Sequence, residues 1–348
     1  MQKWQRNGYH GAAPEEWRDA CIWGINLKRL LASALVIIFL AGLPGLTFVA
    51  LADDSHPCNA LTFDHPHSDT CNADVAANPL PDLVRPTQPD PKMDGYSKPW
   101  SILLPKDPLP YKVGWMIHDW YYSDVPGVQP PALSTDRLVH KAQLVYVYAT
   151  VKTSAGLPWV MVGPDRWMPG EYVAVLTMPH RPDGVSGPWI ALDLSQQTII
   201  ALDGDTPIFA TLVSAAWGGF GVTREGLFHI YGRTIDMTFR GPPWAKVPEY
   251  IIPHVPYVMF FDQNIGLHGA YWHNYFGYER THGCVNIPVA DEKWLWNWVS
   301  GMSDKWGPDD GSFFMKHPEN APWVFVYKST KPNETAMVSA TSPLPPNY

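Results

Sequence analysis

The segment Thr281-His282-Gly283-Cys284-Val285-Asn286 places a cysteine directly after a glycine and two residues after a histidine. A second histidine, in His268-Gly269, lies thirteen residues before Thr281. A thiol attacks only as the thiolate, and a nearby imidazole can take its proton. The segment therefore indicates a cysteine nucleophile with a histidine base. The alternative is a structural cysteine with two loop histidines.

The composition limits the kinds of partner. The chain has 348 residues, of which 46% are hydrophobic and only 17% charged, with a formal net charge of −8. Its Lys and Arg residues form no cluster, which argues against nucleic acid as a partner. The length allows two modest domains with appendages.

Residues 30–52 form an apolar run of 23 residues without a charge, long enough to cross a bilayer as a helix. Five basic residues precede it and two acidic residues follow it, so we expect residues 1–29 in the cytoplasm and the remainder outside. This predicts a membrane-anchored protein. The alternative is secretion after cleavage at Ala52, because Ala50-Leu51-Ala52 fits a cleavage site.

Export changes how the cysteines are interpreted. Cys58 and Cys71 lie thirteen residues apart, and outside the cell a disulfide is their natural pairing. A metal site with the neighbouring histidines matches no standard zinc spacing, so no metal is expected. Cys284 is then the unpaired thiol of the exported part, and catalysis would explain it.

Before the catalytic segment the sequence predicts a linker and a small β domain. Residues 53–110 are His- and Asp-containing and then Pro-rich, which is typical of an extended spacer. Residues 111–180 contain short β-like runs separated by turns, which favour a small β-barrel. The stretch from Trp159 to Gly163, with Arg166-Trp167 and Tyr172-Val173, resembles bacterial SH3-like domains.

From residue 187 onward the pattern predicts a mainly β domain. Runs at 189–194, 198–202 and 206–214 form a meander, further strands are expected at 223–230 and 257–261, and 323–327 closes the domain. One short helix is predicted over 291–300, capped by Asp291. We expect residues 329–348 to be a disordered tail.

The segment around Cys284 offers further catalytic groups. The N–H groups of Gly283 and Cys284 could form an oxyanion hole, and either His268 or His282 could be the base. Neither a nucleotide-binding loop nor a zinc-protease motif is present.

His268-Gly269 together with residues 281–286 resembles the active-site motif of the L,D-transpeptidases, the YkuD-type catalytic domain, over residues 187–328. The resemblance implies a mainly β, sandwich-like catalytic domain with one short helix. It departs from the family at Thr223-Arg224, where the family usually has Thr-Pro, and in a slightly shorter spacing between His268 and Thr281. Both departures lie in loops and put the shape of the substrate cleft in doubt.

The resemblance implies a role for each matching residue. Cys284 is the nucleophile, His268 is the base, and the carbonyl of Gly269 orients His268. His282 and Gly283 shape the loop and the oxyanion hole. Thr281 and Asn286 fix the loop or contact substrate, although a purely structural role is equally compatible with both.

The implied reaction is acyl transfer on peptidoglycan stem peptides, without a cofactor. Cys284 forms a thioester with a tetrapeptide stem and releases D-alanine, and an amine of a second stem takes the acyl group in a 3→3 cross-link. An L,D-carboxypeptidase using water and a transpeptidase attaching wall proteins share this mechanism. A non-catalytic wall-binding scaffold is a different class of answer.

Overall fold

A computed structural model describes residues 56–87, 99–128, 130, 134–218, 221–241, 250–302 and 314–329. The predicted membrane segment 30–52, the cytoplasmic segment 1–29 and nearly all of the predicted tail 329–348 lie outside these residues. No helix within the described ranges is long and apolar enough to cross a membrane. The described part is mainly β, as the sequence predicted, and contains two α-helices.

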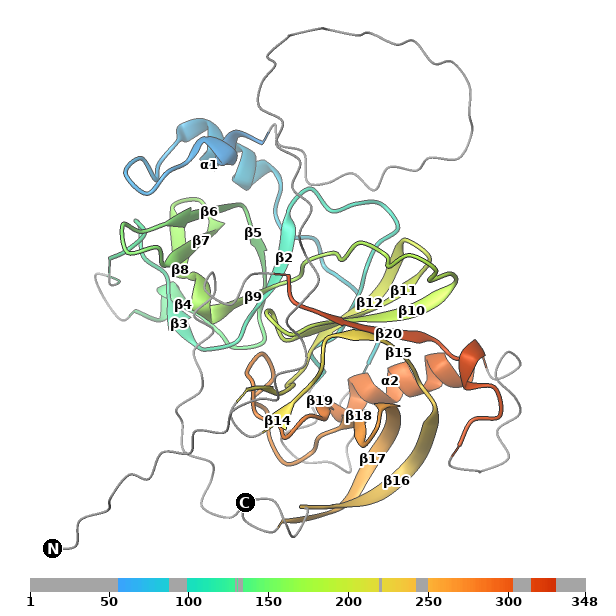
Figure 1. The fold of residues 1–348 in the computed structure, drawn as a ribbon. Coiled ribbons are helices and arrows are strands. Elements are labelled where there is room, and N and C mark those ends of the chain that lie inside the picture. The colour runs from blue at the N-terminus through green and yellow to red at the C-terminus, as the bar shows by residue number, and fades with distance from the viewer. Residues whose placement is uncertain are drawn as a thin grey trace, which may run out of the picture. The chain divides into compact units, whose positions relative to one another are not determined.

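The first catalytic-domain sheet has six strands (Figure 1). Its central strand β10 pairs antiparallel with β11 and parallel with the closing strand β20. The predicted meander is therefore present, with the last strand inserted beside the first. In sheet order the strands are β1 (Ile102–Leu103), β12 (Thr206–Leu212), β11 (Thr198–Asp203), β10 (Pro188–Asp193), β20 (Trp323–Tyr327) and β15 (Gly226–His229).

The second sheet lies against the first and carries the catalytic motif. It consists of β16 (Gly232–Arg240), β17 (Ile251–Asp262), β18 (Ile265–Gly269) and β19 (Val285–Ile287), and helix α2 (Val289–Ser300) follows. Apolar side chains of both sheets and of α2 share one core, for example Ile190, Met259 and Leu295. The burial of such surface drives the sheets together at roughly 25 cal/mol per Å². A short hairpin, β13 (Trp217–Gly218) with β14 (Gly221–Val222), precedes β15.

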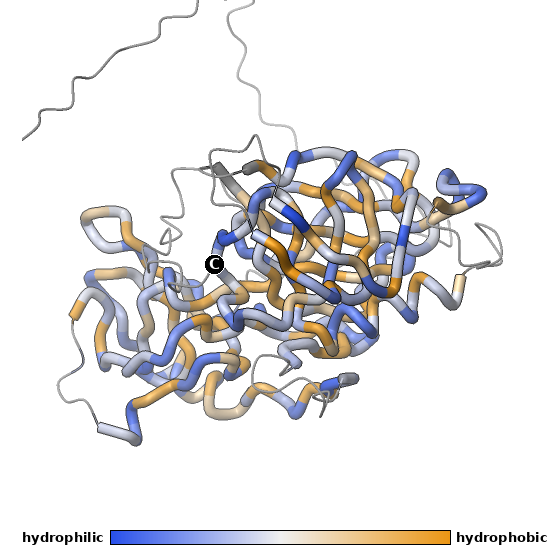
Figure 2. The backbone as a smooth tube through the Cα atoms, turned by 90° about the horizontal axis from the view of Figure 1, so that it is seen from below, coloured by the Kyte–Doolittle hydropathy of each residue, from blue (hydrophilic) through white to orange (hydrophobic). Residues whose placement is uncertain are grey.

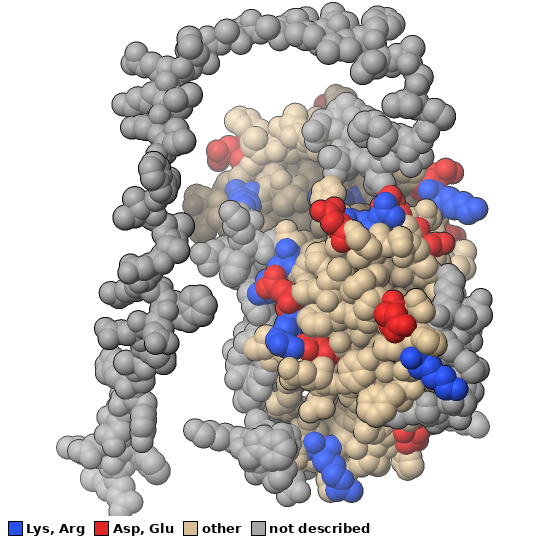
Figure 3. Space-filling model, turned by 45° about the vertical axis from the view of Figure 1, so that its right-hand side comes forward, with Lys and Arg blue, Asp and Glu red and all other residues tan. Residues whose placement is uncertain are grey.

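Both faces of the six-stranded sheet are covered, which explains why its central strands are apolar almost throughout. On β10, Ile190 and Leu192 point into the core shared with the second sheet. Trp189 and Ala191 point to the opposite face and pack with residues such as Trp115. Figure 2 shows the resulting concentration of hydrophobic segments along the crossing strands. The face in Figure 3 instead carries interspersed acidic and basic side chains around wide uncharged areas.

The face of the six-stranded sheet that carries Trp189 and Ala191 packs against the N-terminal β region, which we define as residues 111–175. It contains three small sheets, in the orders β5-β2-β9, β3-β4 and β6-β7-β8. Its SH3-like character stays a prediction. The strands are β2 (Lys112–Met116), β3 (Trp120–Tyr121), β4 (Leu138–Val139), β5 (Leu144–Val147), β6 (Ala149–Lys152), β7 (Pro158–Gly163), β8 (Arg166–Pro169) and β9 (Val173–Val175).

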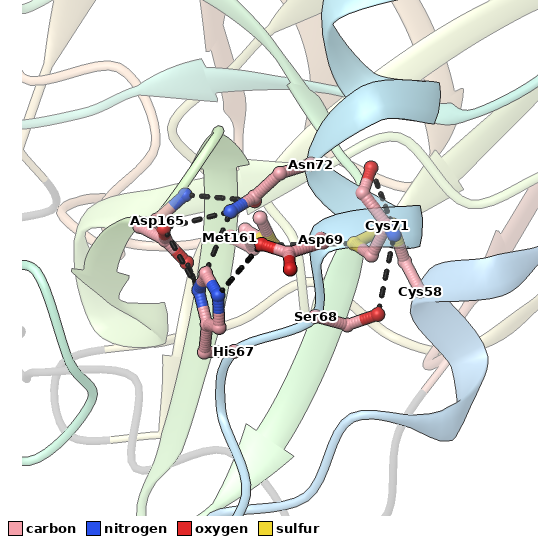
Figure 4. Close-up of polar contacts among 8 residues, drawn as sticks. All are labelled: Cys58, His67, Ser68, Asp69, Cys71, Asn72, Met161 and Asp165. Atoms are coloured by element: carbon pink, nitrogen blue, oxygen red, sulfur yellow. Dashed lines mark hydrogen bonds and ion pairs between the residues drawn. A yellow bond between two sulfur atoms is a disulfide. The ribbon is translucent and has the colours of Figure 1, made fainter.

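The described part of the predicted linker is folded rather than extended. Cys58 and Cys71 form a disulfide, and helix α1 (Asp69–Ala77) begins at the N-cap Ser68. Both cysteines belong to the core of the N-terminal β region. Asn72 donates to Asp165, which also contacts His67 at 2.9 Å (Figure 4). The prolines that suggested a spacer lie mainly after residue 78. Before them, the disulfide and these contacts fix residues 56–78 on the β region.

Asp291 is not the cap that the sequence predicted. Helix α2 begins two residues earlier, and its N-cap Pro288 makes no side-chain cap. Asp291 is fully buried and accepts four hydrogen bonds of 2.7–2.9 Å, from the hydroxyls of Thr87, Ser101 and Thr211 and from the N–H of Trp100. The carboxylate therefore connects α2 to β12 and to the chain that leads into β1. The remaining short helices are 3-10 turns at Pro57–Ala60, Thr135–Arg137, Gly170–Tyr172 and Pro318–Asn320.

Candidate active site

The pairing of β18 with β19 brings the two halves of the motif together. The strands are parallel, with Leu267 opposite Val285 and His268 opposite Asn286. Leu267 and Val285 are fully buried in the core between the sheets. Because side chains alternate along a strand, His268 and Asn286 point to the opposite face. Cys284 lies two residues before Asn286, in the bend that leads into β19.

His268 is held as a neutral imidazole. Its side chain is buried, and Nδ1 lies 3.2 Å from the carbonyl of Gly269. A carbonyl only accepts, so Nδ1 carries the proton and Nε2 keeps the lone pair. Burial lowers the pKa of His268 to about 4, while the Gly269 hydrogen bond opposes this shift. The ring packs edge-on against Phe239 and parallel to Trp272, with centroid distances of 4.8 and 5.7 Å. His268 is therefore available as a base at neutral pH.

Cys284 is the free cysteine of the described residues, and its side chain is partly exposed. Its Sγ lies 3.5 Å from the carbonyl of Asn264 and donates to it. Burial of the sulfur raises the pKa of the thiol to about 11, and a backbone hydrogen bond from Gly266 opposes this shift. The resting group is thus the thiol, which must lose its proton to a base before it can attack.

Glycine is needed in the turn before Cys284. Gly283 has φ +135°, a backbone conformation that other residues rarely adopt. Its N–H donates to the hydroxyl of Thr281 at 3.2 Å, and its carbonyl accepts from Thr223 at 2.7 Å. Thr281 thus fixes the loop through its side chain. The Gly283 N–H would have to leave this bond to serve an oxyanion, so its part in the oxyanion hole stays a prediction.

The other two motif residues have different surroundings. His282 is exposed and stacks on Tyr250, with ring centroids 5.5 Å apart. Asn286 is buried; its amide contacts Nε2 of His273 at 2.7 Å, and its backbone exchanges two 2.8 Å bonds with Ser214. Asn286 therefore fixes the loop between β18 and β19, whereas His282 lies on its outer side.

Four residues near the motif were not identified as site residues from the sequence: Thr223, Phe239, Tyr250 and Asn264. The sequence singled out Thr223 only because Thr223-Arg224 stands where the resembled family usually has Thr-Pro. Nothing in the local sequence indicates that the Thr223 hydroxyl reaches the carbonyl of Gly283. Phe239 and Tyr250 come from the β16–β17 hairpin, and Asn264 contributes a backbone carbonyl, which no sequence motif encodes. Strand pairing and packing, not residue type, bring these groups to the site.

No site for a metal is found in the part of the chain that the structure describes, where no group of three or more His, Cys, Asp or Glu residues is placed to hold one. Cys58 and Cys71 are bonded to each other, so their sulfurs are not free to act as ligands. Of the neighbouring histidines, His65 and His67 are exposed and His56 is half-buried.

Comparisons with known proteins bear on residues 187–331, which match the family model of the YkuD L,D-transpeptidase catalytic domain. Similar solved structures include L,D-transpeptidases from three bacteria. The Enterococcus faecium protein has 20% identity and a TM-score of 0.32, with 41% of this chain and 50% of that chain covered. The Stackebrandtia nassauensis protein has 22% identity and a TM-score of 0.29, with 44% of this chain and 60% of that chain covered. The Mycobacterium smegmatis protein has 13% identity and a TM-score of 0.32, with 51% of this chain and 79% of that chain covered.

This chain thus spans 50% and 60% of the first two of these proteins. A search among curated proteins gave no match. The family model begins at residue 187 and does not bear on the SH3-like resemblance of residues 111–180. Residues 187–331 of this chain match the L,D-transpeptidase catalytic-domain family, as the motif around Cys284 predicted.

Proposed function

We propose that this chain is a cysteine-dependent L,D-transpeptidase that acts on peptidoglycan stem peptides. The observation that carries the proposal is the parallel register of β18 and β19, which pairs His268 with Asn286, two residues after Cys284. The family match of residues 187–331 supports the same reaction class.

The first half of the reaction forms a thioester. Nε2 of His268 takes the proton of the Cys284 thiol as the sulfur attacks the carbonyl carbon that precedes the terminal D-alanine. The tetrahedral intermediate then collapses and breaks the C–N bond, and the proton passes from His268 to the departing amine. Because thiol and imidazole are both neutral at rest, the proton passes from sulfur to Nε2 as the sulfur attacks the substrate.

The second half transfers the acyl group. An amine of a neighbouring stem attacks the thioester, His268 takes the amine's proton, and the proton returns to sulfur as the thiolate leaves. The product is a 3→3 cross-link. Water as acceptor would give an L,D-carboxypeptidase, and a protein lysine would attach a wall protein. All steps use the thiol, the imidazole and the two substrates, so the proposal includes no cofactor.

The test uses the purified full chain with muropeptides that contain tetrapeptide stems. Wild type should release D-alanine, form cross-linked dimers and show an acyl adduct on Cys284 by mass spectrometry. Cys284→Ala should do none of these. Identical products from wild type and Cys284→Ala would contradict the proposal and would favour the non-catalytic scaffold.

A histidine pair separates the two candidate bases. Loss of the base from a coupled pair lowers acylation by orders of magnitude. We expect this from His268→Ala, whereas His282→Ala, at the exposed histidine, should retain most of the rate. The opposite ranking would assign the base to His282.

We also propose that residues 30–52 anchor the chain in the membrane, with the domains outside. The apolar run and the basic residues before it support this topology. N-terminal sequencing of the mature protein tests it, because a start at Asp53 would instead show cleavage at Ala52 and secretion.

A further inference from the structure

The turn between β17 and β18 and the start of β18 contact the sulfur of Cys284 through one backbone group each. The carbonyl of Asn264 accepts the thiol proton, and the backbone of Gly266 hydrogen-bonds the sulfur. Asp262 pairs with Ile265, so Gln263 and Asn264 form the tip of a two-residue hairpin loop. Loop tips are ordinarily among the freer parts of a fold. Here the tip sets where the thiol points.

Arg224 ties this tip down. Its Nε donates to one carboxylate oxygen of Asp262 at 2.8 Å, and its Nη2 donates to the other. The Asp262 side chain is 4% exposed, whereas that of Arg224 is 53% exposed. The hydroxyl of Tyr231 donates to the carbonyl of Gln263 at the same tip. A bidentate pair of this kind fixes orientation as well as distance.

The neighbouring residue Thr223 holds the other side of the nucleophile. Its buried hydroxyl donates to the carbonyl of Gly283 at 2.7 Å and accepts the N–H of Ala216 at 3.1 Å. The peptide bond into Cys284 is therefore fixed by Thr223, and the turn that contacts its sulfur is fixed by Arg224.

We propose that Thr223 and Arg224 are positioning residues for Cys284, Thr223 acting through the Gly283 carbonyl and Arg224 through Asp262 and the turn at 262–264. The inference rests on the proposed role of Cys284 as the nucleophile. It also gives a use to the arginine that stands where the resembled family usually has proline, since proline could not make this ion pair.

The experiment compares wild type with Arg224→Gln, Asp262→Asn and the double variant in the full chain. Glu225→Gln is the matched control, because it breaks the neighbouring ion pair between Glu225 and Lys328. In that pair Lys328 Nζ lies 2.8 Å from an oxygen of the Glu225 carboxylate, whose side chain is 52% exposed. Two rates are measured for each protein. One is acylation of Cys284 by a tetrapeptide stem; the other is alkylation of Cys284 by iodoacetamide across pH, followed on the Cys284 peptide by mass spectrometry.

We expect Arg224→Gln to slow acylation about tenfold to a hundredfold, because small displacements of a reacting group cost rates of this size. A looser turn exposes the sulfur to water, so the apparent pKa of the thiol should fall toward its ordinary value and alkylation at neutral pH should become faster. Asp262→Asn should behave alike, and the double variant should be no worse than either single variant.

Thr223 provides an independent check. Thr223→Val removes the hydroxyl and should also slow acylation, whereas Thr223→Ser keeps the hydroxyl and should restore most of the rate. If Arg224→Gln matches Glu225→Gln in both acylation and alkylation, or if Thr223→Val matches wild type, the positioning inference is overturned while Cys284 remains the nucleophile. Activity in Cys284→Ala would instead overturn the proposed function.

Discussion

The hydroxyl of Tyr278 donates a 3.2 Å hydrogen bond to the backbone carbonyl of Ile117, joining the loop between His268 and Cys284 to the N-terminal β region. Nearby, Lys141 Nζ donates to the carbonyl of Asn274 at 2.8 Å. Gly277, with φ +93°, lies so close to Ile117 that a Cβ would not fit. The N-terminal β region therefore directly supports the loop between His268 and Cys284.

Tyr278→Phe should weaken both stability and acyl transfer. The change removes one partly buried hydrogen bond, worth about 1 kcal/mol of unfolding free energy, and frees the loop at the point where it meets Ile117. Urea unfolding and the acylation rate measure the two effects. Tyr148→Phe is the control, since that hydroxyl donates to Asn78 at 3.0 Å, away from the loop. A similar loss of stability with unchanged acylation is expected there. Equal acylation in both variants would mean that the support is not needed for catalysis.

The pH dependence of acylation should show an unusually acidic limb. His268 acts as a base only when neutral, and burial lowers its pKa to about 4. The single-turnover rate should therefore stay constant from pH 7 to about 5 and fall as the pH drops through about 4, not through the ordinary histidine value near 6.5. A limb centred near 6.5 would show that His268 is not the buried neutral base.

Stability must be followed over the same range. Burial lowers the pKa of His273 to about 3. Unfolded histidines take up protons near pH ~6.5. The native state does so only at lower pH, so the free energy of unfolding falls as the pH drops from that value toward 4. Circular dichroism at each pH separates loss of structure from protonation of His268.

Asp291→Ala should destabilise the protein strongly. It leaves the buried donors of Thr87, Trp100, Ser101 and Thr211 without their acceptor, and each buried unpaired donor costs about 1–3 kcal/mol. Because the first three precede the catalytic domain, we also expect this segment to become more sensitive to protease. Asp205→Ala, which removes an exposed ion pair with Arg181, should change the unfolding free energy by less than about 0.5 kcal/mol. Similar unfolding curves for the two variants would refute the structural role of Asp291.

Several features could be predicted because they depend on local pattern. The runs beginning at Trp189 and Thr198 are short and apolar and are separated by turn residues, and both are strands with nearly the expected bounds. Helix α2 was also expected, because its apolar residues recur at helical spacing. Its start was misplaced because Asp291 is the right type of residue for a cap but is used in the core instead.

The segment before the catalytic domain was harder to predict. Proline frequency indicated an extended spacer, but it says nothing about long-range partners. The predicted disulfide between Cys58 and Cys71 is confirmed and lies within the segment. The pairing of Ile102 with Ala210 and the bonds from Trp100 and Ser101 to Asp291 are long-range contacts that the local sequence does not indicate. They turn the described part of this segment into an integral part of the fold.

The sequence by itself determined the chemistry at issue: a cysteine, a preceding glycine and two histidines at a family-like spacing. Only the tertiary structure decided which groups surround them. The parallel pairing of β18 with β19 sets His268 opposite Asn286, two residues after Cys284. Burial lowers the pKa of His268 and raises that of Cys284, so both groups are neutral at rest. Thr223, Asp262 and Asn264 come from other strands and turns, so their positions follow from sheet register and packing, to which residue spacing along the chain gives no direct guide.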